Sequence, residues 1–239
     1  MTAQNPMQTS IDHIIIAVAD LAGASAEYST LLGRAPSWHG AHPDYGTANT
    51  LFKLDNTYIE LLAPQGEGMA ADIVNRILST RGPCLGGLVF GTESADDFIS
   101  HARSQGLEAS DPVPGHGVDE QTGAERRWRN MFWDPAAARG IFSFCIEHEA
   151  ESTLPEAAPH GAGAIAGVDH VVVKTQSAEA AKTFYGDQLG IRLALEQDVP
   201  EWGGVQLFFR ASSMSIAVIV SDTVPEQDEP WGLARKTDD

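Results

Sequence analysis

The hydrophobic pattern along the chain repeats at long range. The segments 11–33 and 168–190 both begin with a β-branched apolar run, continue through alanine-rich sequence, and end at a glycine. This pattern predicts a strand, then a helix, then a glycine cap. The two segments align without gaps at an offset of 157 residues, so we predict a duplicated unit. The identities are Asp12/Asp169, His13/His170, Ala24/Ala181, Tyr28/Tyr185, Leu32/Leu189 and Gly33/Gly190.

Each copy continues into paired strands. After the first predicted helix, the apolar and polar alternation predicts strands over 49–54 and 56–62, separated by a tight turn. After the second predicted helix, strands are expected over 205–210 and 214–220. The repeated unit is therefore a strand, a helix and two or three antiparallel strands, which is a βαβββ module.

A weaker copy lies between these two. It has a predicted strand over 87–94, a helix over 95–106 with apolar residues at helical spacing, and a hairpin formed by 125–134 and 141–148. The last nine residues, 231–239, fit the first strand of a further copy. We therefore predict an α+β fold of tandem βαβββ modules that form cupped mixed sheets, with three complete modules and the start of a fourth.

These modules suggest two domains. Residues 1–150 form the predicted N-terminal domain, residues 151–167 a linker rich in Ala, Pro, Gly and Glu, and residues 168–239 the C-terminal domain. The predicted modules span 11–64, 85–149 and 168–221, and the strand 231–239 begins the fourth. Because proteins usually cover an exposed sheet edge, we expect this last strand to be completed by further chain or by a second copy in a homodimer.

The charge of the chain narrows the range of partners. Asp and Glu number 33 against 15 Lys and Arg, and the formal net charge is −18. Such a surface repels phosphate backbones and anionic lipids, so we expect neither nucleic acid nor a membrane as partner, and instead a small molecule. The polar N-terminus, the absence of a long apolar run and the two cysteines predict a cytoplasmic protein without a disulfide framework.

The stretches IDHIIIAVADL, NTYIELLAP and GVDHVVVKT resemble the vicinal oxygen chelate superfamily, and HPDYGTAN resembles its glyoxalase-like subgroup. The superfamily includes glyoxalase I, extradiol dioxygenases, methylmalonyl-CoA epimerase and bleomycin resistance proteins. The resemblance implies that paired modules curl around a pocket. In metal-using members this pocket holds a divalent ion, bound by a first-strand His and a last-strand Glu from each paired module.

His13 and Glu60 stand in these ligand positions of the first module. Strand alternation puts His13 on one face with Ile15, and Glu60 needs a partner because an isolated buried charge is costly. Their nitrogen and oxygen donors suit Zn, Ni, Fe or Mn. We therefore predict His13 and Glu60 as metal ligands, and Glu60 as the catalytic residue. Each residue taken alone is more often a hydrogen-bonded core residue.

The other modules depart from the family pattern. The second module has Gly87 at the histidine position and Phe144 or Glu147 near the glutamate position, and the third keeps His170 but has Ala217 in place of the glutamate. The candidates for a further ligand or a substrate contact are His42, Asn49 and His170. Arg126, Arg127 and Arg129 lie in a predicted strand whose alternate charged residues are expected to face solvent, although one arginine is a candidate partner for a substrate carboxylate. His148 is expected at the surface.

Three functions remain open on this pattern. The first is a metal-dependent lyase, isomerase or epimerase that acts on a small oxygenated carbonyl or aromatic metabolite by stabilising an enolate. The second is a metal-free protein of the bleomycin-resistance type that sequesters a small molecule. The third, an extradiol dioxygenase, is disfavoured because the C-terminal half offers only His170 where such chemistry needs two His and one Glu.

Overall fold

The computed structural model describes residues 9–150, 152, 154–156, 160–202, 204–223 and 227–237. Parts of two predicted segments lie outside these residues. They are residues 151, 153 and 157–159 of the predicted linker and residues 238–239 of the predicted strand 231–239.

The chain is a mixed α+β structure made mostly of strands, as predicted. The strands are β1 (Ser10–Ala17), β2 (Trp38–His42), β3 (Thr47–Lys53), β4 (Tyr58–Pro64), β5 (Cys84–Gly91), β6 (Val113–Asp119), β7 (Glu125–Met131), β8 (Phe142–His148), β9 (Ile165–Thr175), β10 (Arg192–Val199), β11 (Gly204–Ala211), β12 (Met214–Val220) and β13 (Glu229–Thr237). The helices are α1 (Leu21–Leu32), α2 (Met69–Arg81), α3 (Ala95–Ser104) and α4 (Ala178–Ala181), which continues as a π-helix over Lys182–Gln188. Short 3₁₀ turns span Pro43–Tyr45 and Pro200–Trp202.

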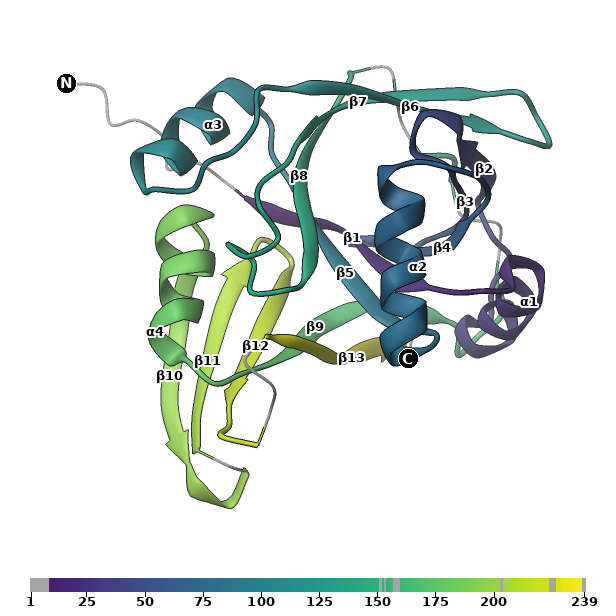
Figure 1. The fold of residues 1–239 in the computed structure, drawn as a ribbon. Coiled ribbons are helices and arrows are strands. Elements are labelled where there is room, and N and C mark those ends of the chain that lie inside the picture. The colour runs from purple at the N-terminus through teal and green to yellow at the C-terminus, as the bar shows by residue number, and fades with distance from the viewer. Residues whose placement is uncertain are drawn as a thin grey trace.

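Eight strands close into a barrel in the order β1-β4-β3-β2-β6-β7-β8-β5 (Figure 1). β1 pairs parallel with β4, and β5 pairs parallel with β8. The two modules are joined twice by antiparallel pairs, β1 with β5 and β2 with β6. Closure leaves no free edge in this sheet. Side chains along each strand alternate between the lumen and the outer face.

The remaining strands form an open sheet in the order β10-β11-β12-β9-β13, in the lower part of Figure 1. β9 pairs parallel with β12 and antiparallel with β13, just as β1 pairs with β4 and β5. The strand predicted at the start of a fourth module is thus present as β13, and it takes the place that β5 has in the barrel. Its pairing with a second copy stays a prediction.

The module helices begin after capping side chains. Asp20, Ser94 and Ser177 precede α1, α3 and α4, and each side chain accepts a backbone N–H from the first turn. Such caps satisfy donors that a helix start leaves unpaired. α1 ends at Gly33, whose φ of 67° is the left-handed conformation that favours glycine.

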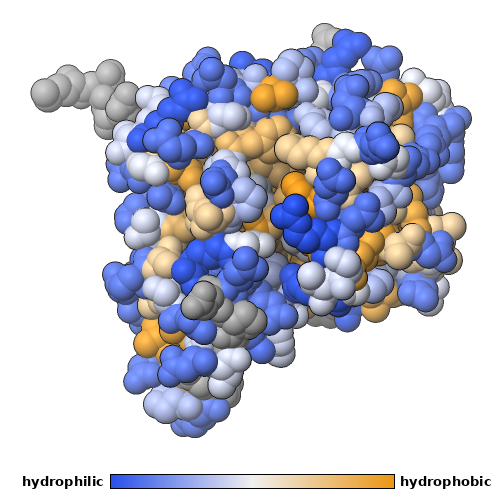
Figure 2. Space-filling model, viewed as in Figure 1, coloured by the Kyte–Doolittle hydropathy of each residue, from blue (hydrophilic) through white to orange (hydrophobic). Residues whose placement is uncertain are grey.

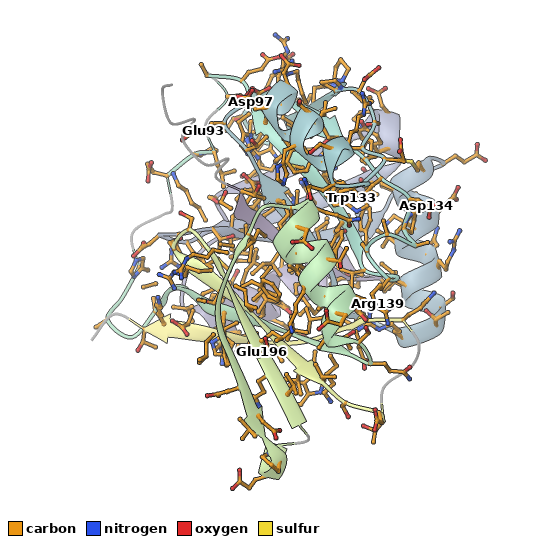
Figure 3. The ribbon with its side chains drawn as sticks, turned by 90° about the vertical axis from the view of Figure 1, so that its left-hand side faces the viewer. Glu93, Asp97, Trp133, Asp134, Arg139 and Glu196 are labelled. Atoms are coloured by element: carbon orange, nitrogen blue, oxygen red, sulfur yellow. The ribbon has the colours of Figure 1, made fainter. Side chains whose placement is uncertain are left out.

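Two apolar clusters hold the structure together. The larger includes residues of the barrel strands, the module helices and the second sheet, and the smaller, with Ile15 and Leu62, lies in the barrel lumen. Trp133 lies between α3 and α4 and contacts the ring of Phe184 at 6.1 Å between centroids (Figure 3). Nearby, Arg139 forms a 2.7 Å ion pair with Asp228 that joins the barrel to the second sheet. Hydrophilic residues cover most of the face in Figure 2, and apolar surface shows between them.

Some elements differ from the sequence-based expectations. The second strand of each module, which is β2, β6 or β10, was not located by its pattern, and α2 between the first two modules was not predicted at all. The strands β2 and β6 together contain three glycines, three histidines and one proline, so their alternation of apolar and polar residues is weak. They form because the barrel closes through them, which is a tertiary effect.

Candidate active site

The candidate site is built on the parallel pair β1 and β4. The register sets His13 opposite Tyr58 and Ile15 opposite Glu60, so alternate residues of both strands point into the barrel. His13 and Glu60 are each only 5% exposed. The Nε2 atom of His13 lies 3.1 Å from Oε2 of Glu60. The structure therefore brings together the two residues on which the chemical prediction depends.

A second carboxylate holds the other side of the imidazole. Nδ1 of His13 lies 2.7 Å from Oδ1 of Asp12, and Oδ2 of Asp12 lies 2.9 Å from Nε2 of His148. A carboxylate only accepts hydrogen bonds, so both ring nitrogens of His13 carry protons when both contacts are made. His13 is therefore an imidazolium between two carboxylates.

The electrostatics of the pair follow from this arrangement. Burial alone would lower the pKa of His13, but the hydrogen bonds to Asp12 and Glu60 outweigh it and raise the pKa to about 9. Burial alone would raise the pKa of Glu60, but His13 outweighs it and lowers the pKa to about 2. Two neighbouring groups with pKa values pushed apart are the usual basis for assigning an acid and a base.

Asn49 and His42, two of the candidates for a further ligand or substrate contact, lie beside Glu60. Nδ2 of Asn49 donates to Oε1 of Glu60 at 2.6 Å and lies 3.3 Å from Nε2 of His42. Burial lowers the pKa of His42, and the charges of His13 and Arg126 lower it further, although Glu60 opposes this. His42 is therefore neutral and lies next to a charged pair.

Glu60 and His42 lie where two cavities of the barrel lumen meet. One cavity, of about 60 Å³, is mainly apolar and extends to the first turn of α2. The second, of about 50 Å³, reaches His13, Tyr58 and Arg126. Glu60 is thus a charged group between a mainly apolar cavity and one lined by polar and charged side chains. The apolar lining of the first cavity includes the side chains of Ile15, Leu62, Trp128, Phe132, Phe142 and Phe144.

Several residues of the site were missed or misplaced by the sequence reasoning. Arg126 was not singled out from the other arginines of its strand, but it is 6% exposed and lies in the lumen with Trp128. The signal was present, because residues 126 and 128 share a strand face and Trp128 is apolar. His148, expected at the surface, is bonded to Asp12. No pattern pointed to that contact, since it joins strands 136 residues apart.

His170, a candidate ligand or substrate contact, lies in the second sheet and not in the barrel. Its Nδ1 atom is 2.9 Å from Asp169, and its side chain is 31% exposed. The register places Ser215 opposite His170, so Ala217 takes the position that Glu60 has in the barrel. His170 therefore gains no carboxylate from β12, and this sheet does not supply the two His and one Glu that extradiol chemistry needs.

The residues present do not fit the predicted divalent metal, whether Zn, Ni, Fe or Mn. Within the described part of the chain, no group of three or more His, Cys, Asp or Glu is placed to hold an ion. The ring of Phe144 lies 6.3 Å from that of His13, where the family pattern expects a glutamate. Metal sites in enzymes use three or four protein ligands, and here both nitrogens of His13 already face carboxylates.

Comparison with known proteins agrees with this fold. A family described as a Glyoxalase-like domain matches residues 11–168. The ethylmalonyl-CoA/methylmalonyl-CoA epimerase of Cereibacter sphaeroides is 43% identical over 58 residues, which is 24% of this chain and 43% of the epimerase. The chain thus matches less than half the length of that curated relative.

Two solved structures share the architecture. A hypothetical protein from Staphylococcus aureus superposes with a TM-score of 0.66 at 14% identity, over 90% of this chain and 87% of that one. A mutant of 4-hydroxymandelate synthase from Streptomyces coelicolor gives a TM-score of 0.63 at 17% identity, over 92% of this chain and 65% of that one. At these identities the likeness concerns the fold. Among the described residues, no helix is long and apolar enough to cross a membrane.

Proposed function

The chain belongs to the glyoxalase-like domain family of the vicinal oxygen chelate superfamily, and we propose that it catalyses metal-independent proton transfer at a carbon next to a carbonyl group. Such a step makes the protein an isomerase, an epimerase or, if a leaving group departs, a lyase. The observation that carries this proposal is the buried pair of Glu60 and His13, 3.1 Å apart, at the junction of two cavities.

In the proposed step, Glu60 removes the proton and the electron pair of the C–H bond moves into the carbonyl group, which becomes an enolate. In an isomerase the proton is then delivered to a neighbouring carbon. In an epimerase the same carbon takes a proton, exchanged with water, on the opposite face of the enolate. Tyr58 lines the cavity beside Glu60, and burial raises the pKa of its hydroxyl well above the usual value. This hydroxyl therefore stays protonated and is placed to donate to the enolate oxygen.

The low pKa of Glu60 restricts the substrate. A carboxylate that His13 keeps ionised to about pH 2 is a weak base, so it abstracts only a proton from an acidic carbon. Carbons between two carbonyl groups, or next to a 2-oxo group, meet this requirement. Because the two cavities are small, the part of the substrate that reacts must also be compact.

The proposal is tested by exchange of hydrogen for deuterium in D₂O, followed by proton NMR on a panel of 2-oxo and 1,3-dicarbonyl compounds. We expect enzyme-dependent exchange for at least one compound, and Glu60→Gln, which keeps the shape of the side chain, should slow it by about 10²–10⁴-fold. The matched control is Glu125→Gln, since Glu125 is an exposed glutamate of β7 paired with Arg127. Equal exchange in Glu60→Gln and wild type would refute the assignment.

Metal independence is tested separately. We expect protein purified without chelator to contain well below one equivalent of transition metal, and exchange to be unchanged by EDTA. A stoichiometric metal that is required for exchange would overturn the metal-free mechanism.

The alternative function, sequestration of a small molecule, is favoured by the weak basicity of Glu60. It predicts binding of a panel compound with no exchange in either protein.

A further inference from the structure

A second charged group lies in the lumen of the barrel, on β7. Arg126 is 6% exposed, and its Nε atom is buried without a hydrogen-bond partner in the described structure. We propose that Arg126 is the anchor of a carboxylate-binding subsite in the cavity it shares with Glu60. The subsite rests on the proposed function for its place in a reaction, since it makes the substrate a small carboxylic acid.

The guanidinium of Arg126 is not neutralised by an acidic residue. It lies 5.6 Å from the ring centroids of Trp38 and Tyr58, and the described residues place no carboxylate within ion-pair distance of it. The nearby carboxylates of Asp12 and Glu60 both accept from His13. Cation–π contacts are weaker than a paired charge, so the guanidinium keeps most of its capacity to bind an anion.

The other buried arginine of the described residues also has an unpartnered Nε atom, but its terminal nitrogens are bonded. Arg34 donates through Nη1 and Nη2 to the backbone carbonyls of Lys53 and Ile165, at 2.7 and 2.6 Å. These bonds tie the barrel to β9, so Arg34 has a structural role. Arg126 makes no comparable bond to a backbone carbonyl in the described chain. Its polar partner among the described residues is the side chain of Tyr58, which carries no charge. A buried cation without a countercharge is costly to keep, which points to an anionic ligand that completes it.

Unpartnered polar atoms gather around this same cavity. Five buried side-chain atoms among the described residues have no hydrogen-bond partner, and three of them belong to residues that line the cavity of about 50 Å³. These are Oδ1 of Asn49, Nε of Arg126 and Nδ1 of His148. Native proteins satisfy nearly all buried polar groups, so their concentration here indicates a polar occupant.

The size of the cavity favours a carboxylate. About 50 Å³ accommodates roughly three to five groups the size of a water molecule, which suits the three non-hydrogen atoms of a carboxylate. The planar guanidinium matches the two oxygens of that group. Tyr58, Arg126 and His148 also line a larger groove of about 600 Å³ outside the barrel. A ligand can therefore reach Arg126 from this groove. With its carboxylate at Arg126, the carbons attached to that carboxylate would extend toward Glu60.

The test is binding of acetate, pyruvate and malonate by calorimetry, at constant ionic strength, with phosphate and chloride as comparison anions. We expect the carboxylates to bind to wild type and Arg126→Gln to weaken them about tenfold or more, the usual cost of a charge-assisted hydrogen bond. Arg126→Lys, which keeps the charge but loses the planar group, should also weaken binding. The matched control is Arg127→Gln on the same strand, since Arg127 is exposed and paired with Glu125.

Circular dichroism checks that each variant folds, and the Nε–H resonance of Arg126 in the wild-type protein gives a readout that needs no variant. We expect this resonance to shift on titration with pyruvate. Unchanged binding in Arg126→Gln, a resonance that does not move, or equal binding of phosphate would each overturn the subsite. The proposed function fails separately, through unchanged deuterium exchange in Glu60→Gln. Carboxylate binding should persist in that variant.

Discussion

The barrel and the open sheet contain the same dipeptide in the same place. Asp12 and His13 lie in β1, Asp169 and His170 lie in β9, and both strands pair parallel with the last strand of their module. In each pair the Asp carboxylate contacts Nδ1 of the His, at 2.7 Å in the barrel and 2.9 Å in the sheet. The local motif is therefore preserved in both copies.

The two histidines differ in how far their side chains are exposed and in one residue of the neighbouring strand. The side chain of His13 is 7% exposed and that of His170 is 31% exposed, because only the first copy lies inside a closed barrel. The strand beside His13 contributes Glu60, and the strand beside His170 contributes Ala217 at the same register. The Asp-His pair is thus a structural feature common to both copies. Only in the first copy is the pair enclosed by a barrel and faced by a carboxylate, that of Glu60.

The largest expected effect comes from making the barrel resemble the sheet. Glu60→Ala removes the acceptor of His13 and leaves the imidazolium with Asp12 alone in a buried site. We expect the free energy of unfolding at pH 6 to fall by about 4 kcal/mol, as for a broken buried ion pair, and deuterium exchange to be lost. Urea denaturation measures the first effect. Glu125→Ala, at an exposed position of β7, is the control and should change stability by less than about 0.5 kcal/mol.

The sequence predicted the module architecture that the two copies share. It predicted fewer of the contacts that distinguish the barrel from the open sheet. The offset of 157 residues holds in the strand register, since Tyr58 faces His13 and Ser215 faces His170. The meeting of His13 with Glu60 was predictable, because period-two alternation puts both on one face of adjacent strands. A resemblance to the superfamily supplied the pairing of the strands.

The remaining contacts of the site depend on closure. His148 reaches Asp12 across 136 residues, and the lumen that Arg126 lines is closed by the pairing of β2 with β6 at Gly40 and Asp119. Neither pairing leaves a local pattern in the sequence. The predicted metal required a four-ligand set that the sequence already showed to be incomplete, and the structure places Phe144 near the position of a missing ligand.

The second prediction concerns pH and the buried pair. The pKa of His13 is raised from 6.5 to about 9, so its stabilisation is complete below pH 6.5 and is lost as the pH rises through 9. The pKa of Glu60 is lowered from 4.5 to about 2, so its stabilisation is present above pH 4.5 and is lost as the pH falls through 2. The pair is most stabilising between pH 4.5 and 6.5.

His13→Gln tests this window. The difference in the free energy of unfolding between wild type and His13→Gln should shrink by about 3 kcal/mol between pH 6 and pH 10. Urea denaturation at several pH values measures it. Parallel stability curves for the two proteins would show that His13 is not charged in the folded barrel.

A smaller effect is expected from the two aspartates. Asp12 is 15% exposed and accepts from two histidines, which lower its pKa although burial opposes them. Asp169 is 50% exposed and pairs with His170 and Lys236. We expect Asp12→Asn to reduce the free energy of unfolding by about 2 kcal/mol and Asp169→Asn by less than about 1 kcal/mol. Equal losses would mean that burial does not distinguish the two copies.

The smallest effect is expected at His170 itself. Its imidazole is about one-third exposed and contacts the adjacent Asp169, which also has Lys236 at 3.2 Å as a second cation. His170→Gln therefore leaves Asp169 paired and buries no new charge, so stability should change by less than about 0.5 kcal/mol and deuterium exchange should not change. The matched variant His13→Gln should lose exchange. A comparable loss of exchange in His170→Gln would place chemistry in the open sheet, and the contrast between a closed site and an open scaffold would then be wrong.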